Sequence, residues 1–201
     1  MQPRRKPPIL AGLNVGLVNA CSAVHKAAEI HALIAEHHLD VLHVTETSFL
    51  PDAPDTISMD IAPPGFRLLS AVSSNGRRGG GLAVIFKEHL KVSTAKLPLS
   101  PSSFEMQAIN LIVGNINFTL LGIYRPPSTN TDTFLEKLSD VLDAVNLTDR
   151  HSIILGDVNC PGSKPDDIDH RLSALLIYYG LAIMNPEPLT FTQTEVRASW
   201  T

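Results

Sequence analysis

The stretch SIILGDVN, residues 152–159, has the pattern of a buried β-strand that ends in a polar turn. Its unbroken apolar run is typical of a strand covered on both faces, and Gly156 permits a sharp exit. Asp157 and Asn159 are two residues apart and therefore point the same way. A carboxylate base beside a neutral hydrogen-bond donor suits the activation of water next to a phosphate. The structural alternative is an Asx-type turn at the end of a strand.

Earlier strands in the chain also end in polar side chains. The buried run 41–44 leads into Glu46, and a lone carboxylate at such a place can hold a hard divalent cation. A turn glutamate exposed to water is the alternative. The strand 117–124 ends in Tyr124-Arg125-Pro126-Pro127, which presents a phenol and a guanidinium before a stiff exit. The alternative for these residues is an aromatic side chain at a rim and a simple strand stop.

Three segments have the apolar periodicity of amphipathic helices: residues 24–38, 133–145 and 167–179. Thr133 and Glu136 have the spacing of a capping box at the start of the second helix. Gly180 stands where a glycine ends the third helix.

Short apolar strands are expected between the helices, at residues 13–20, 41–44, 81–86, 106–113, 117–124 and 152–155. Asn75-Gly76 and Gly114-Asn115 fit hairpin turns. Strands in the middle of the chain, with helices near both ends, predict an α+β fold in which sheet packs on sheet and helices lie outside.

Composition limits the class of protein. Of 201 residues, 44% are hydrophobic and 18% are charged, which excludes disorder over most of the length. Cys21 and Cys160 cannot make a disulfide framework, no signal peptide is visible, and no apolar run approaches the roughly 20 residues that span a bilayer. We therefore expect a soluble, intracellular protein that is not secreted and does not bind a membrane. A flexible basic arm, 1–8, would precede one domain, 9–201.

The charge balance, 16 basic against 20 acidic residues, gives a net charge of −4 and argues against tight non-specific binding to DNA. A protein of this charge could still bind nucleic acid through a local basic rim. The candidates for such a rim are Arg77, Arg78, Arg125, Lys164 and Arg171.

Taken in order, the polar strand ends resemble those of the endonuclease/exonuclease/phosphatase superfamily. They are Asn19, Thr45-Glu46-Thr47, Tyr124-Arg125-Pro126-Pro127 and Gly156-Asp157-Val158-Asn159. The Tyr-Arg-Pro-Pro element is similar to that of the apurinic-type endonuclease domains of non-LTR (LINE-type, jockey-like) retrotransposons. The resemblance runs from about residue 13 to the end of the chain and includes 79–84 and 103–105.

The resemblance implies a four-layer αββα sandwich of two packed mixed sheets flanked by helices. It also implies Mg²⁺, or Mn²⁺ in its place, with Glu46 as metal ligand and Asn19 helping to position metal and phosphate. Tyr124 would contact the phosphate or leaving oxygen, Asp157 would orient or deprotonate water, and Asn159 would hydrogen-bond the scissile phosphate. The activity implied is an endonuclease that nicks DNA at a target site. It would act in the nucleus on chromosomal DNA, beside a reverse transcriptase domain of the same element.

One element of the family has no match. The family closes with a strand that carries Ser-Asp-His, and the sequence ends at Ala198-Ser199-Trp200-Thr201 without that triplet. Asp169-His170 is only 12 residues beyond Asp157, and a place in the first turn of a helix explains it better. Loss of a transition-state donor and its orienting partner is expected to leave little turnover. We therefore expect a C-terminally incomplete, weakly active or inactive fragment.

Two alternatives stay open. One is a phosphatase or phosphodiesterase of the same fold, although Cys160-Pro161 stand where such enzymes usually carry an arginine or aromatic residue. The other is a non-catalytic retrotransposon remnant.

Overall fold

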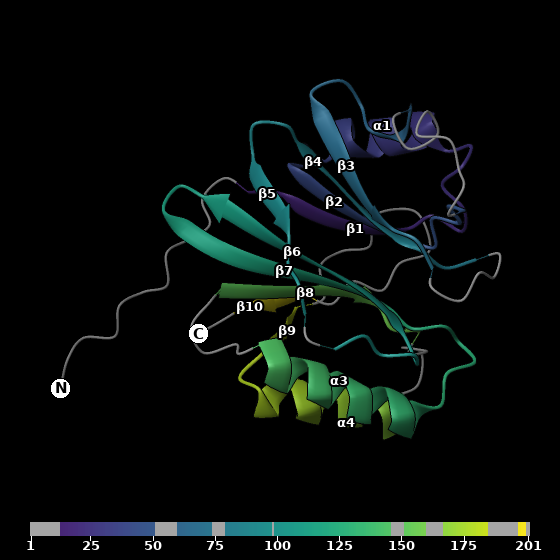
Figure 1. Ribbon diagram of the computed structural model, residues 1–201, viewed down its shortest axis with the longest axis vertical. Coiled ribbons are helices and arrows are strands. Elements are labelled where there is room, and N and C mark those ends of the chain that lie inside the picture. Colours follow the sequence, from purple (N-terminus) through teal and green to yellow (C-terminus); the bar gives the residue numbers. More distant parts are fainter. Residues whose placement is uncertain are drawn as a thin grey trace.

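The computed structural model describes residues 13–50, 60–73, 79–97, 99–145, 151–159, 167–184 and 197–199. Its elements stack in four layers, with α1 above one sheet and with α3 and α4 below a second sheet (Figure 1). The predicted α+β sandwich of two mixed sheets and flanking helices is confirmed. The arm predicted at 1–8 and the turn predicted at Asn75-Gly76 lie outside the described residues.

The first sheet has the strand order β1-β2-β4-β3. Its strands are β1 (Val15–Asn19), β2 (Val41–Thr45), β3 (Phe66–Ala71) and β4 (Leu82–Lys87). The helix α1 (Ala27–Glu36) crosses from β1 to β2, so these two strands run parallel. The pairs β2–β4 and β3–β4 are antiparallel.

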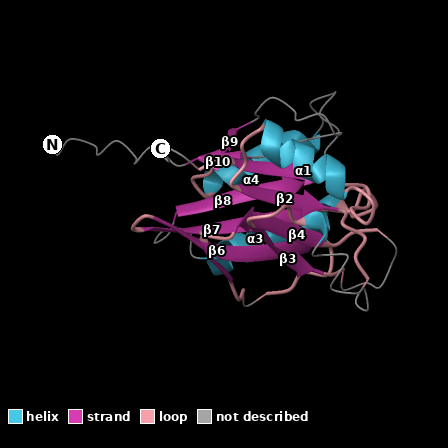
Figure 2. Cartoon of the chain, turned by 90° about the horizontal axis from the view of Figure 1, so that it is seen from above, coloured by secondary structure: helices cyan, strands magenta, loops and turns pink. Residues whose placement is uncertain are grey.

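The second sheet has the order β5-β6-β7-β8. Its strands are β5 (Lys91–Thr94), β6 (Glu105–Val113), β7 (Ile116–Tyr124) and β8 (His151–Asp157). β6 and β7 form the predicted hairpin through Gly114, which has the positive φ of +60° that such a turn requires. The helix α3 (Thr131–Val145) connects β7 to β8, and these strands are again parallel. A short antiparallel pair, β9 (Ala182–Met184) and β10 (Arg197–Ser199), lies at the β8 edge of this sheet (Figures 1 and 2).

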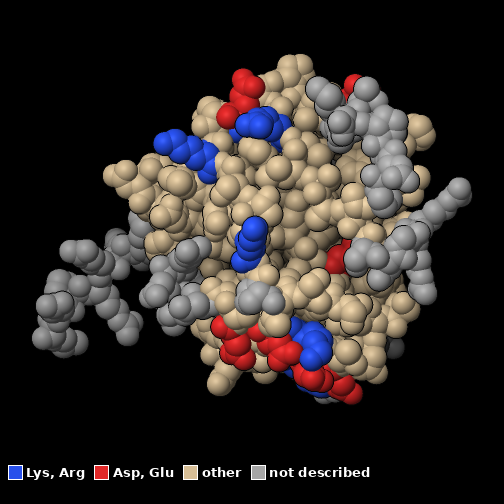
Figure 3. Space-filling view, viewed as in Figure 1, with Lys and Arg blue, Asp and Glu red and all other residues tan. Residues whose placement is uncertain are grey.

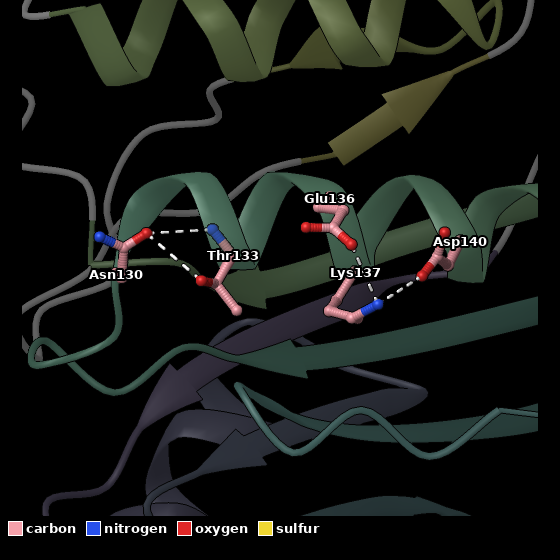
Figure 4. A network of polar contacts seen from close by, with 5 residues as sticks. All are labelled: Asn130, Thr133, Glu136, Lys137 and Asp140. Carbon is pink, nitrogen blue, oxygen red and sulfur yellow. Dashed lines mark hydrogen bonds and ion pairs between the residues drawn. The ribbon is translucent and has the colours of Figure 1, made fainter.

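The start of α3 corrects one sequence prediction. Thr133 does not cap the helix, because Asn130 does so: its Oδ1 accepts hydrogen bonds from the Thr133 amide at 3.1 Å and the Thr133 hydroxyl at 3.4 Å (Figure 4). Glu136 is therefore free of the capping role and contacts Lys137 at 3.2 Å. The helix α4 (Asp167–Tyr178) ends as predicted at Gly180, which has a φ of +71°.

Three apolar layers hold the four structural layers together. Along β7, alternate residues face opposite sides, so that Leu121 and Ile123 pack toward α3 while Phe118 and Leu120 pack toward the first sheet. On the other sheet, Leu42 and Val44 pack toward α1. The inter-sheet core is formed by Leu17, Val41, Val84, Phe86, Ile109, Leu111, Phe118, Leu120 and Leu155. Both sheets are thus covered on both faces. None of the helices in the described segments is both long and apolar enough to span a membrane.

Candidate active site

Parallel pairing brings the polar strand ends together within each sheet. In the first sheet Asn19 lies opposite Thr45, the residue before Glu46. In the second sheet Tyr124 lies opposite Asp157. Since the carboxyl ends of parallel strands meet at one sheet edge, each sheet contributes one carboxylate and one further polar group to its own edge.

The side chain of Asn19 joins the two edges. Its Nδ2 donates to Glu46 Oε1 at 2.8 Å and to Asp157 Oδ2 at 2.6 Å, and Asp157 belongs to the other sheet. Its Oδ1 accepts the backbone N–H of Cys21 at 2.9 Å, which orients the amide with nitrogen toward the carboxylates. Two acidic groups from opposite sheets therefore converge on one neutral amide.

The backbone around these groups is strained. Non-glycine residues with positive φ follow the ends of β1, β2 and β8: Cys21, Ser22, Glu46, Ser48 and Asn159. Residues held in this region are stabilised by their surroundings and are common at functional sites. Here the surroundings include a backbone hydrogen bond from the Ser22 N–H to the Glu46 carbonyl, 2.8 Å long. The strain thus occurs at the same loops that present the two carboxylates.

Asp157 is held on both of its oxygens. Oδ2 accepts from Asn19, and Oδ1 accepts the backbone N–H of Asn159 at 3.1 Å. The Asn159 side chain in turn donates from Nδ2 to the carbonyl of Arg125 at 2.7 Å. Among the described residues nothing accepts the second Nδ2 hydrogen of Asn159, which can therefore bind a ligand.

Tyr124, at the end of β7, is only 7% exposed. Burial raises the pKa of its phenol, and the charge of Glu46 and a hydrogen bond to Glu46 raise it further. The phenol is therefore protonated at neutral pH and can act as a hydrogen-bond donor. A pocket of about 430 Å³ opens beside it, lined by residues that include Gly80, Ser103, Glu105, Pro126 and Asn130.

Glu105, which the family resemblance included within residues 103–105 without a role, also belongs to the site. It lies opposite Tyr124 in the β6–β7 hairpin, and its Oε2 accepts the backbone N–H of Gly81 at 2.6 Å. It also accepts a hydrogen bond from the Ser73 hydroxyl. A Cβ on Gly80 would lie 2.5 Å from Glu105 Oε1, so a glycine is needed for this approach. Register across the predicted hairpin, which pairs Glu105 with Tyr124, is a second signal for Glu105 beside the family resemblance.

On the face seen in Figure 3, the Lys and Arg side chains of the described residues are scattered and form no continuous patch. Arg125 is 4% exposed and points into the protein. Arg171 lies on α4 and pairs with Asp132 at 2.6 Å. Arg77, Arg78 and Lys164 lie outside the described residues. His170 is exposed on α4.

The residues present suit a divalent metal ion of the hard class. Glu46 and Asp157 are two carboxylates that face one another across Asn19, with only the neutral amide between them. In the described segments no group of three or more His, Cys, Asp or Glu could hold a metal. Two carboxylates with water completing the shell are the usual environment of Mg²⁺, whereas Zn²⁺ prefers three or four nitrogen and sulfur ligands.

The sequence model of the Endonuclease/Exonuclease/phosphatase family matches residues 11–200. The chain belongs to this family. The predicted superfamily is thereby confirmed, and family and fold together indicate a hydrolase of the nuclease or phosphatase type. A comparison with curated proteins gave no match.

Solved structures of several such proteins are similar to the chain. The endonuclease domain of TRAS1, a telomere-specific non-LTR retrotransposon, has a TM-score of 0.64 at 16% identity, covering 93% of this chain and 82% of that one. The 3′ phosphatase NExo from Neisseria, bound to a product DNA hairpin, has a TM-score of 0.61 at 13% identity, with coverage of 93% and 86%. An AP endonuclease from Archaeoglobus fulgidus has a TM-score of 0.60 at 13% identity, with coverage of 92% and 86%. At these identities the likeness shows a common fold.

Proposed function

We propose that this chain is the DNA endonuclease domain of a non-LTR retrotransposon, which hydrolyses one phosphodiester bond with the help of a divalent metal ion. The observation that carries the proposal is the convergence of Glu46 and Asp157, from opposite sheets, on the amide of Asn19. Isolated carboxylates in turns have no reason to meet in this way. Paired acidic groups at a strand-end edge suit phosphate chemistry.

Glu46 would hold the metal ion, Mg²⁺ or Mn²⁺, with Asn19 positioning the carboxylates around it. When bound, the ion would act as a Lewis acid on the phosphate and offset charge on the leaving oxygen. Asn19 would position both carboxylates through its side-chain nitrogen, because Nδ2 donates hydrogen bonds to Glu46 and to Asp157. Its oxygen is taken by Cys21.

Asp157 would orient the attacking water and accept its proton. Two hydrogen bonds fix its carboxylate, and an oriented base is more effective than a mobile one. Asn159 would donate its remaining amide hydrogen to the scissile phosphate. Tyr124, kept protonated by burial and by Glu46, would donate its hydroxyl to a phosphate or leaving oxygen.

The choice of DNA as substrate rests on two supports. One is the resemblance of Tyr124-Arg125-Pro126-Pro127 to retrotransposon endonucleases, and the other is the fold shared with the TRAS1 domain. In such an element the domain would work in the nucleus beside a reverse transcriptase domain. A phosphatase of the same fold would instead act on small phosphate esters.

The 201 residues contain no Ser-Asp-His triplet, so we expect this chain by itself to nick DNA weakly. Removal of one preorganised donor costs about 10²–10³ in rate, and removal of an acid or base about 10²–10⁴. Adding a closing strand with Ser-Asp-His to the C-terminus should therefore raise Mg²⁺-dependent nicking of supercoiled plasmid. In the extended chain, Asp157→Asn should lower the rate at least about 10²-fold, because an amide keeps the shape but cannot accept a proton.

The matched control is Asp140→Asn, the same chemical change on the exposed surface of α3, which should leave nicking unchanged. Hydrolysis of small phosphate esters with no nicking would favour the phosphatase. No hydrolysis of either substrate by the extended, folded chain would favour the non-catalytic remnant. Strong nicking by the unextended chain would show that another group does the work of the missing histidine, and His170 would be tested first.

A further inference from the structure

Arg125, the first residue after β7, is a buried arginine that binds only neutral groups. Nη1 donates to the carbonyls of Val158 at 3.1 Å and Asn159 at 3.5 Å. Nη2 donates to the Thr129 carbonyl at 2.7 Å and the Thr131 hydroxyl at 3.2 Å. Among the described residues no carboxylate pairs with its guanidinium.

These acceptors belong to two separate loops. Val158 and Asn159 follow β8 and carry one side of the candidate site, whereas Thr129 and Thr131 lead into α3. The guanidinium also lies over the ring of Phe134, 5.2 Å from its centroid, within the core under α3. One side chain thus joins the β8 exit to the start of α3.

The backbone of Arg125 completes the connection. Its N–H donates to the Asp157 carbonyl at 2.9 Å, and its carbonyl accepts the Asn159 side-chain amide at 2.7 Å. Asn159 has a φ of +45°, a conformation that its surroundings must impose. The guanidinium binds the carbonyl of that same residue. Arg125 therefore restrains Asn159 at its backbone and at its side chain.

We infer that Arg125 is a positioning residue, which holds Asn159, and through it Asp157, in the geometry of the site. The inference rests on the proposed function for the roles of Asn159 and Asp157, but the restraint is a property of the chain itself. A lysine cannot replace the arginine here, because a single ammonium cannot reach acceptors of two loops in a fixed plane or stack on Phe134 in the same way.

Arg125→Lys tests this inference, since it keeps the charge and removes the planar fork. In ¹H–¹⁵N spectra of the 201-residue chain, the Asn159 side-chain amide should lose the chemical shift of its hydrogen-bonded state. Its hydrogens should also exchange faster with solvent. Asn159→Asp identifies its resonance. The Kd for Mn²⁺, measured by calorimetry, should rise about tenfold, because the Asn159 backbone N–H holds Asp157, whose carboxylate lies beside the proposed metal ligand Glu46. Arg67→Lys, the same change at an exposed arginine of β3, should alter neither.

Stability is measured separately, by thermal unfolding, so that a purely structural role can be recognised. A lower Tm with an unchanged Asn159 amide and an unchanged Kd for Mn²⁺ would overturn the inference. If Arg125→Lys does not fold, Thr131→Val removes one arm of the fork without burying a new charge, and a smaller change in the same Asn159 signal is expected. An unchanged signal in that variant would also overturn it. Absence of hydrolysis in the folded chain extended with Ser-Asp-His would count against the proposed function, whereas the Asn159 signal reports on Arg125 alone.

Discussion

Gly122→Ala tests how closely the two sheets must pack for the site to form. Gly122 is buried in β7, two residues before Tyr124, and faces the buried ring of His43 in β2. A Cβ built on Gly122 would lie 1.7 Å from His43 Nε2 and 2.2 Å from Cε1. The ring must therefore move by well over 1 Å, or the sheets must separate.

The size of the effect follows from this overlap. Overpacking a buried site costs about 1–3 kcal/mol, and the preference of a strand for alanine over glycine returns about 0.5–1 kcal/mol. We expect a net loss of about 1 kcal/mol in the free energy of unfolding, or about 2–4 °C in Tm for a chain of this length. His43 lies three residues before Glu46, and Gly122 lies two residues before Tyr124. A clash between the new methyl group and the His43 ring should therefore displace these site residues and weaken Mn²⁺ binding as well.

The assay is urea unfolding followed by circular dichroism, carried out as a double-mutant cycle with His43→Ala. When the ring is absent, the new methyl group has space, and Gly122→Ala should cost nothing or stabilise the protein. The coupling free energy should then be about 2 kcal/mol in favour of the double variant. An equal loss from Gly122→Ala with and without the ring would refute the assignment of this contact.

Three further predictions concern individual residues. Burial lowers the pKa of His43 to about 4, below its value of 6.5 in the unfolded chain. The free energy of unfolding should therefore be highest above pH 6.5 and fall by ~3 kcal/mol as the pH drops toward 4. His43→Leu should remove this pH dependence when unfolding is measured across the same range. Gly80→Ala should lower Tm more than Gly79→Ala, because both have positive φ but only the first meets Glu105, and equal losses would contradict this. Asn130→Ala should cost about 1 kcal/mol in urea unfolding through loss of the α3 cap, and no loss would show that the cap contributes nothing.

The strongly patterned parts of the fold could be predicted from the sequence. The strand before Asp157, the hairpin at Gly114 and the helix stop at Gly180 each depend on local chemistry, and the structure confirms all three. β3 and β5 were missed because their residues are partly exposed and alternate only weakly between apolar and polar. A partly exposed strand lacks the two-sided burial that makes an apolar run visible.

The same distinction applies to the site. Asn19, Glu46 and Asp157 stand out because polar residues directly follow apolar runs, and the structure brings them together. Arg125 was expected at a rim and is buried instead. Its partners are backbone carbonyls of two loops, which no spacing in the sequence encodes.

The central claim is that Glu46 holds a divalent metal ion beside the carboxylate of Asp157, and calorimetric titration with Mn²⁺ tests it most directly. The 201-residue chain should bind one ion in this site. Glu46→Gln and Asp157→Asn should each weaken Mn²⁺ binding at least about tenfold. The control variant Asp140→Asn should leave the affinity unchanged. Binding that survives both substitutions, or wild-type protein that is folded and binds no Mn²⁺, would contradict the account.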